Sequence, residues 1–274
     1  MQPRLENLTI QPFLKWAGGK RWLTNHVDKI IPRFNGKYIE PFLGSGAVFF
    51  HLAPSSAILS DTNKDLILTY QAIRSDWKKV EKVLEKHQKK HSKEYYYSIR
   101  SSRPRLPHTK AAQFIYLNRT CWNGLYRVNL SGAFNVPIGT KNKVILESDR
   151  FDEIAKRLEK AELSTSDFEL TINRAGEDDF VFVDPPYTVK HNYNGFIKYN
   201  ENLFSWEDQL RLKSSIDRAV ERGAKVLVTN ANHPSLKELY RDYRQLGMSR
   251  KNALAAQAKH RGRFEELLVF CGYT

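Results

Sequence analysis

Five short apolar segments recur along the chain, and stretches with helical patterns separate them. Each apolar segment ends at a turn-forming or charged residue, which is typical of parallel strands that are buried on both faces. Alternation of such strands with helices predicts an open α/β sheet. The expected strands cover residues 37–42, 56–60, 161–166, 180–184 and 224–229. The expected helices cover residues 20–31, 45–51, 149–160, 205–222 and 234–241.

The segment 65–148 interrupts this alternation. It is rich in helical patterns and ends in a stretch with Asn-Gly and Ser-Gly turn signals. We therefore expect residues 1–64 and 149–274 to form the domain that contains the sheet, and residues 65–148 to form an inserted helical lobe. A lysine-rich stretch at 78–93 is interpreted as the solvated face of a helix, with phosphate binding as the alternative.

The net charge of the chain narrows the choice of partners. Lysine and arginine number 44 against 30 acidic residues, which gives a net charge of +14. Such an excess favours a polyanionic partner, either nucleic acid or an acidic membrane surface, although a basic protein can also lack one. The sequence contains no apolar run of the ~18–20 residues that span a bilayer and no signal peptide. Two cysteines suffice for neither a disulfide framework nor a metal site, so we expect a cytoplasmic protein without a metal.

The tetrapeptide Asp-Pro-Pro-Tyr at 184–187 follows an apolar run, at the edge where open α/β sheets bind ligands. Proline has no N–H donor and a φ fixed near about −65°, so the carbonyl of Pro185 is held as a free acceptor. Asp184 and this carbonyl can accept both hydrogens of one amino group, while Tyr187 offers a ring for stacking. A planar base with an exocyclic amino group fits this description. A strand-ending acid followed by an ordinary proline turn is the alternative.

Two glycine turns indicate a second ligand. Gly44 and Gly46 lie between an expected strand and a helix, where glycine lets the backbone approach a ligand. Asp61 ends the next strand, near the offset of about 20 residues at which an acid binds ribose hydroxyls. The earlier turn places Trp16 and Lys20 where they can cover a small zwitterion. A cofactor with a ribose but no pyrophosphate fits both turns; capping roles and a core position for the tryptophan are the alternatives.

With its motifs in this order, the chain resembles the Dam-type DNA adenine-N6 methyltransferases. The segments that carry the resemblance are FLKWAGGK, EPFLGSG, SDTNKD, NGLYR and DFVFVDPPY, with a weaker match at RFEELLVF. The resemblance implies a Rossmann-like S-adenosylmethionine-dependent methyltransferase sheet, in which the lobe at 65–148 recognises the target. It also implies double-stranded DNA as substrate, S-adenosylmethionine as methyl donor and no metal.

The resemblance assigns roles to individual residues. Asp184, Pro185 and Tyr187 would hold and stack the adenine while its amino group attacks the methyl group directly and in line. The base would have to leave the duplex to reach them. The residues that would contact or line the cofactor site are Trp16, Lys20, Gly44, Asp61, Asp167, Phe168 and Asp184.

Recognition of a DNA sequence would fall to the segment NGLYR. By the resemblance, Asn123, Leu125 and Arg127 would approach the bases of a GATC site. Arginine can bond guanine O6 and N7 in the major groove, and a contact of Arg127 to phosphate alone is the alternative. The basic stretch 249–264 is expected to form a mobile loop over DNA phosphates.

Two rival functions remain open from the residues. One is an amino methyltransferase that acts on cytosine N4, RNA adenine or protein glutamine, and the other is an inactive DNA-binding relative. Related cytosine-N4 enzymes usually begin the tetrapeptide with Ser and glutamine enzymes with Asn, so Asp184 favours adenine. A bacterial or phage source is expected, with a restriction endonuclease of the same site as a candidate partner.

Overall fold

The computed structural model describes residues 10–129, 132–188, 204–251 and 263–273, and the chain divides into two compact units. The expected lobe at 65–148 falls within the first of them. The first unit comprises residues 1–24, 43–54 and 63–165, and the second comprises residues 25–42, 55–62 and 166–274.

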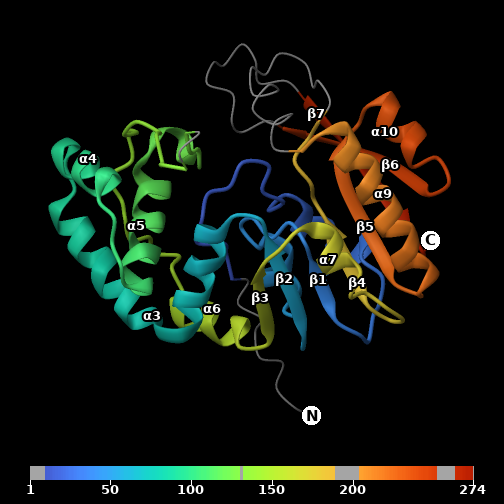
Figure 1. Ribbon diagram of the computed structural model, residues 1–274, viewed down its shortest axis with the longest axis horizontal. Helices are drawn as coiled ribbons and strands as arrows, with labels where there is room; N and C mark the ends of the chain where they lie inside the picture. Colours follow the sequence, from blue (N-terminus) through green and yellow to red (C-terminus); the bar gives the residue numbers. More distant parts are fainter. Residues whose placement is uncertain (1–9, 130–131, 189–203, 252–262, 274) are drawn as a thin grey trace. The chain divides into compact units, whose positions relative to one another are not determined.

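A seven-stranded sheet has the strand order β3-β2-β1-β4-β5-β7-β6 (Figure 1). Strand β1 pairs in parallel with β2 and β4, β4 pairs in parallel with β5, and β7 runs antiparallel to β5 and β6. The predicted α/β class is confirmed, and the mostly parallel sheet is consistent with a Rossmann-like methyltransferase sheet. The strands are β1 Tyr38–Glu40, β2 Ala57–Asp61, β3 Ala161–Thr165, β4 Phe180–Val183, β5 Lys225–Ala231, β6 Arg244–Lys251 and β7 Arg263–Cys271.

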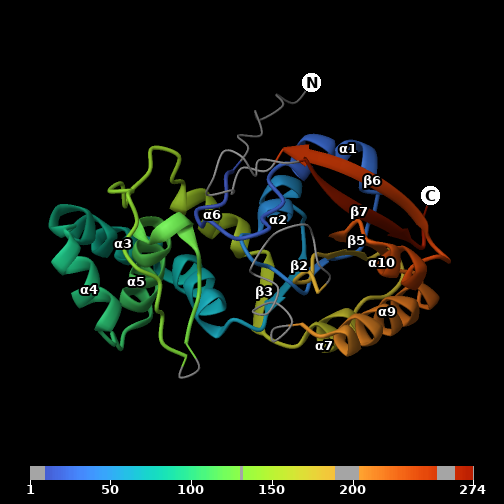
Figure 2. The same cartoon turned by 90° about the horizontal axis from the view of Figure 1, so that it is seen from above.

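Strands β6 and β7 were not predicted from the sequence. Residues 249–251 end β6 and residues 263–264 begin β7, so the prediction of a loop over 249–264 is wrong at both ends. Its middle, residues 252–262, lies outside the described residues. Strand β6 forms the edge of the sheet (Figure 2), and its polar sequence reflects an exposed edge strand that gives no apolar signal.

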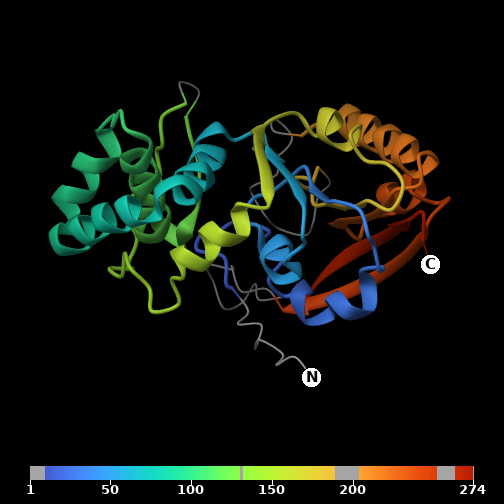
Figure 3. The same ribbon diagram turned by 90° about the horizontal axis from the view of Figure 1, so that it is seen from below.

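Three helices of the second unit are α7, α9 and α10. Helices α7 and α9 lie side by side (Figure 3), and the apolar face of α9 packs on the sheet through Leu212 and Ile216. A capping box begins α9: the Ser205 hydroxyl accepts from the Asp208 N–H at 3.1 Å, and the Asp208 carboxylate accepts from the Ser205 N–H at 2.9 Å. The helices are α7 Phe168–Ile172, α9 Trp206–Glu221 and α10 Pro234–Leu239.

The helix expected at 20–31 is confirmed only in part, because its first turn is not helical and its middle is a 3₁₀ turn. A 3₁₀ turn, Leu23–His26, and a single short helix, α1 Val27–Ile30, take its place. Gly18 has a φ of 77°, and residues 16–19 form a turn closed by the hydrogen bond from the Gly19 N–H to the Trp16 carbonyl at 3.1 Å. This turn directly precedes the expected helix, and residues 20–22 after it are not helical.

The first unit is predominantly helical. Helices α3 and α5 make its main helix–helix contact. In the lysine-rich part of α3, Val80 and Leu84 are buried while Lys78, Lys79 and Lys82 are exposed, which confirms the interpretation as a solvated helix face. Its helices are α2 Ala47–Leu52, α3 Lys64–Lys90, α4 Lys93–Ser101, α5 Pro107–Thr120 and α6 Phe151–Leu158, with a 3₁₀ turn at Trp122–Gly124.

A cluster of histidine and tyrosine side chains joins α3, α4 and α5. The Nδ1 atom of His87 lies 2.8 Å from the Tyr95 hydroxyl, and that of His91 lies 2.8 Å from the Tyr116 hydroxyl. The Tyr96 hydroxyl donates to the Val136 carbonyl at 2.9 Å. Burial lowers the pKa of His87 from 6.5 to about 4, because the charged ring would lose its hydration. The packing of these helices therefore depends on a neutral His87.

We expect acid to destabilise the first unit through this group. The pKa of His87 is lower in the folded state, so the stabilisation is fully present above pH 6.5 and is lost as pH falls toward 4. Between pH 7 and pH 5 the free energy of unfolding should fall by about 2 kcal/mol from His87. Urea unfolding of the wild type and of His87→Gln at both pH values checks this. An equally steep pH dependence in the variant would contradict it.

Candidate active site

Carboxylates lie at the carboxyl ends of neighbouring parallel strands. Glu40 ends β1, Asp61 ends β2 and Asp184 directly follows β4. Because β1 pairs in parallel with β2 and β4, these ends meet at one edge of the sheet. Asp61 and Asp184 thus lie at strand ends as expected, and Glu40 is a further acid that sequence reasoning missed.

Glu40 is almost fully buried, with 3% of its surface exposed, and it accepts a hydrogen bond from the Tyr38 hydroxyl at 2.9 Å. Burial, followed by the nearby carboxylate, raises the pKa of Tyr38 well above its usual value, so the hydroxyl remains a donor. The sequence signal for Glu40 was an acid within the apolar run 37–42, which leads into the glycine turn. A buried acid needs such a partner, so Glu40 is held firmly at this edge.

The Asp-Pro-Pro-Tyr segment is braced from two neighbouring strands. The Asp184 carboxylate accepts from the hydroxyl of Thr229 on β5 at 2.8 Å, and the Tyr187 hydroxyl donates to Glu266 on β7. Thr229 and Glu266 are both buried, Pro185 is buried, and Asp184 and Tyr187 are half-buried. The carboxylate and the ring therefore keep fixed orientations while part of each side chain stays accessible.

Asp167 and Phe168 lie at the start of α7, close to the end of β2. The backbone N–H of Ser166 donates to the carbonyl of Asp61 at 3.2 Å, which brings the two predicted cofactor acids to neighbouring positions. The Asp167 carboxylate caps the helix by accepting from the Glu169 N–H at 2.9 Å. Phe168 is buried, and its ring stacks on Phe42 with a centroid separation of 5.5 Å.

In the first unit, the two glycine turns pack on one another. Gly44 has a φ of 47°, and a Cβ there would lie 2.8 Å from Cδ1 of Trp16. A Cβ on Gly19 would lie 3.4 Å from the Ser45 hydroxyl. Lys20 in the same turn is buried, and its ammonium group donates to the Gly18 carbonyl at 2.9 Å. The structure therefore brings Trp16, Lys20 and Gly44 together, and only glycine fits at position 44.

The ring of Trp16 also connects the turn to the segment expected to read DNA. It stacks on Tyr126 with a centroid separation of 5.8 Å and an interplanar angle of 22°. The side chain of Asn118 accepts from the Lys15 N–H at 2.9 Å and donates to the Lys15 carbonyl at 2.7 Å. Sequence reasoning missed Asn118 and Tyr126, because their contacts join parts of the chain that are far apart in sequence.

The predicted DNA-reading residues present their side chains unequally. Asn123 and Arg127 are exposed and Leu125 is half-buried. The Arg127 guanidinium donates to the side-chain oxygen of Asn135 at 2.8 Å. Asn123 and Gly124 have φ values of 54° and 66°, and the Leu125 N–H donates to the Trp122 carbonyl at 3.2 Å, so the Asn-Gly signal marks a turn. The antiparallel bridge between Val128 and Phe134 lies further along the chain.

Within the described ranges, no group of three or more His, Cys, Asp or Glu side chains is arranged to hold a metal ion. In the same part of the chain, no helix combines the length and the apolar character that crossing a bilayer requires.

Acids at the ends of neighbouring strands and the Asp-Pro-Pro-Tyr segment together form the candidate site. Comparisons with known proteins identify the class of enzyme to which the chain belongs. Residues 16–254 match the family described as D12 class N6 adenine-specific DNA methyltransferases. A type II methyltransferase of Lactococcus lactis subsp. cremoris is 34% identical over 271 residues, covering 96% of this chain and 95% of the relative. The DNA adenine methylase of Escherichia coli (strain K12) is 31% identical over 262 residues, covering 94% of each.

The chain belongs to the D12 class of N6 adenine-specific DNA methyltransferases. The resemblance to Dam-type enzymes is thereby confirmed, and so is the predicted enzyme class, an adenine-specific DNA methyltransferase. The family description names adenine N6 of DNA, which separates the chain from methyltransferases of cytosine N4, RNA or protein glutamine.

Two glycine substitutions test the packing of the turns. Gly44→Ala and Gly18→Ala both place a side chain at positive φ, with a φ of 47° and 77° respectively, so they share the cost of a strained backbone. Only the Cβ at position 44 meets another group, the Trp16 indole, whereas that at position 18 meets open space. We expect Gly44→Ala to lower the free energy of unfolding by about 1–3 kcal/mol more than Gly18→Ala, because of this overlap.

Urea unfolding of both variants measures the difference, and methyl transfer to DNA reports on the turn itself. Equal losses of stability in the two variants would show that Trp16 moves aside without cost.

Proposed function

We propose that this chain transfers the methyl group of S-adenosylmethionine to N6 of adenine in duplex DNA, within GATC, after the base has left the helix. The observation that carries the proposal is the position of Asp184 and Pro185 directly after β4, where Thr229 fixes the Asp184 carboxylate. Relatives named DNA adenine methylase, from Haemophilus influenzae and Escherichia coli, support the choice of adenine.

The amino group of adenine is a weak nucleophile, because the lone pair of its nitrogen is delocalised into the ring. Both hydrogens of the amino group must be held for this nitrogen to become tetrahedral, and the two acceptors can hold them. The Asp184 carboxylate and the Pro185 carbonyl can accept one hydrogen each, and Thr229 fixes the carboxylate at 2.8 Å. Fixed acceptors also stabilise the positive charge that develops on the nitrogen. Holding the reacting atoms in line then supplies much of the rate.

Tyr187 provides the surface on which the flipped base stacks. Its hydroxyl is bonded to Glu266, so the ring orientation is set before a base arrives. Extrusion of a base costs a few kcal/mol, and one base–aromatic stack returns about 1–3 kcal/mol. Because the ring of Tyr187 is already ordered, little conformational entropy is lost when the adenine stacks on it, and more of the stacking energy contributes to binding.

The residues proposed to bind the cofactor fit a zwitterion with a ribose and no phosphate. The Asp61 carboxylate can accept from ribose hydroxyls, and Asp167 can accept from the amino group of the cofactor's adenine beside Phe168. Lys20, Trp16 and Gly44 form the second set, in which the Trp16 indole packs against the position where Gly44 lacks a side chain. S-adenosylmethionine supplies the methyl group.

We assign sequence recognition to Asn123, Leu125 and Arg127 and general DNA affinity to the net charge of +14. The exposed Arg127 guanidinium donates to the side chain of Asn135 at 2.8 Å. The other N–H groups of Arg127 can then donate to the edge of a guanine. The relative from Lactococcus lactis is named a type II methyltransferase, which supports a restriction endonuclease of the same site as a partner.

The proposal is tested by incubating duplex DNA with S-adenosylmethionine that carries a labelled methyl group. We expect label in N6-methyladenine, protection of GATC from a methylation-sensitive endonuclease, and no transfer by Asp184→Ala, because one of the two acceptors is gone. Glu238→Gln, at an exposed acid of the same unit, is the matched control and should retain full activity. Label in DNA with GATC left unprotected would refute the site, and no label would refute the activity.

Arg127→Ala should relax the choice of sequence. Loss of a bidentate arginine–guanine contact costs about 1–3 kcal/mol of discrimination at one base pair. The rate ratio between GATC and duplexes with one substituted base pair should therefore fall about tenfold or more, while non-specific binding changes little. Arg105→Ala, at another exposed arginine of the first unit, should leave that ratio unchanged. If Arg127→Ala lowers only the salt dependence of binding, Arg127 contacts phosphate and reads no base.

A further inference from the structure

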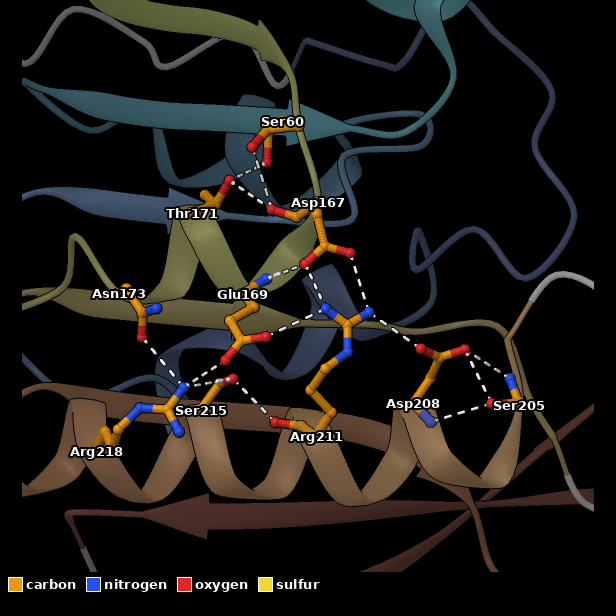
Figure 4. Close-up of polar contacts among 11 residues, drawn as sticks. Ser60, Asp167, Glu169, Thr171, Asn173, Ser205, Asp208, Arg211, Ser215 and Arg218 are labelled. Atoms are coloured by element: carbon orange, nitrogen blue, oxygen red, sulfur yellow. Dashed lines mark hydrogen bonds and ion pairs between the residues drawn. The ribbon is translucent and has the colours of Figure 1, made fainter.

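Arg211 on α9 holds the carboxylate that we assign to the cofactor's adenine (Figure 4). Its two terminal nitrogens bond the two oxygens of Asp167, from Nη1 to Oδ1 at 2.8 Å and from Nη2 to Oδ2 at 3.0 Å. Glu169 and Asp208 accept from the same guanidinium at 3.2 and 3.0 Å. The guanidinium carbon lies 4.2 Å from the centre of the Phe168 ring. One side chain therefore contacts both residues of the proposed adenine site.

This arrangement contributes little to the stability of the fold. The Arg211 and Asp167 side chains are 39% and 37% exposed, and ion pairs with that exposure are weak because water screens them. Three carboxylates around one guanidinium, with the bond to Asp167 as the main cause, raise the pKa of Arg211 above its usual value. The two hydrogen bonds instead fix the orientation of Asp167, because a planar guanidinium that bonds both oxygens sets the plane of the carboxylate.

The bonds leave Asp167 with a defined acceptor. Its Oδ1 atom accepts both from the Glu169 N–H at 2.9 Å and from Arg211. Among the described residues, Oδ2 accepts from Arg211 alone, so one of its lone pairs is available to an N–H donor. Because Arg211 and the helix cap fix the carboxylate plane, the direction of that lone pair is fixed as well.

The same helix end also holds the segment that follows Asp-Pro-Pro-Tyr. The Gln209 side chain donates to the Thr188 hydroxyl at 3.1 Å and accepts from Asn230 at 3.3 Å. Asp208, which bonds Arg211, is the capping-box partner of Ser205. The first turns of α9 thus connect Asp167 with the residue directly after Tyr187.

We propose that Arg211 is a positioning residue for the cofactor: it orients the Asp167 carboxylate and the Phe168 ring so that the free Oδ2 lone pair receives the 6-amino group of the cofactor's adenine. This inference rests on the proposed function, which assigns Asp167 to that adenine. Arg211 touches no reacting atom, and its effect falls on the affinity and selectivity for the nucleoside part of the cofactor.

The experiment compares two ligands by calorimetric titration of the full chain. One is S-adenosylhomocysteine, and the other is its deaminated counterpart, in which a ring carbonyl replaces the 6-amino group. The wild type should prefer the amino compound. Arg211→Ala should weaken binding of S-adenosylhomocysteine about tenfold, equivalent to about one hydrogen bond, and should narrow the preference between the ligands. Arg211→Lys should fall between the two, because a lysine cannot form the paired bonds.

Arg218→Ala is the matched control. Arg218 lies on the same helix, is 40% exposed and bonds Glu169 at 2.7 Å, but its hydrogen bonds go to Glu169, Ser214, Ser215 and Asn173 and none to Asp167. This variant should keep both the affinity and the preference of the wild type. Thermal unfolding of both variants shows whether either loss comes from the fold.

Asp167→Ala separates the inference from the proposed function. If Asp167→Ala loses the preference for the amino compound and Arg211→Ala keeps it, the inference about Arg211 is overturned while Asp167 retains its role. If Asp167→Ala binds both ligands as the wild type does, the proposed role of Asp167 fails. If Arg211→Ala and Arg218→Ala weaken binding equally and unfold at equally lowered temperatures, Arg211 acts through the fold, and the inference is overturned.

Discussion

Parallel pairing of β1 with β2 and β4 is the constraint on which the rest of the second unit depends. It aligns Ile39 with both Ile58 and Val181, so three strands from distant parts of the chain end at the same edge. That edge receives Asp61 and Asp184, which are more than a hundred residues apart in sequence. Apolar burial drives the pairing, and the polar residues follow because each stands directly at the end of a buried strand.

The candidate site residues depend on others to which the sequence assigned no role. Thr229 fixes the carboxylate of Asp184, Glu266 anchors the ring of Tyr187, and Arg211 grips Asp167. Each of these supporting side chains comes from an element that packs against the motif and follows it along the chain. In such an enzyme the chemistry is specified by a few short segments, whereas the orientation of those segments is specified by the remainder of the fold.

The sequence predicts those features of the structure that depend on residues close together in the chain. Strand β4 and helix α9 were predictable because burial and capping leave local patterns. Strand β6 was not, because an exposed edge strand has no apolar face to mark it. The bond between Tyr187 and Glu266 spans 79 residues, and no local pattern encodes such a separation. The positions of Asp61 and Asp184 at strand ends were therefore predictable, whereas the contacts that hold such side chains were not.

The stack of Trp16 on Tyr126 has a consequence for redesign of target choice. A segment transplanted from a relative in place of the proposed recognition segment would bring its own residue to position 126. A small aliphatic residue there would remove one of the rings stacked on the indole, while Phe114 would remain at a centroid separation of 6.4 Å. The turn at residues 16–19, which precedes Lys20, would then lose part of the packing that supports it. Exchanges of this segment should accordingly preserve an aromatic ring there and vary only the exposed positions on either side.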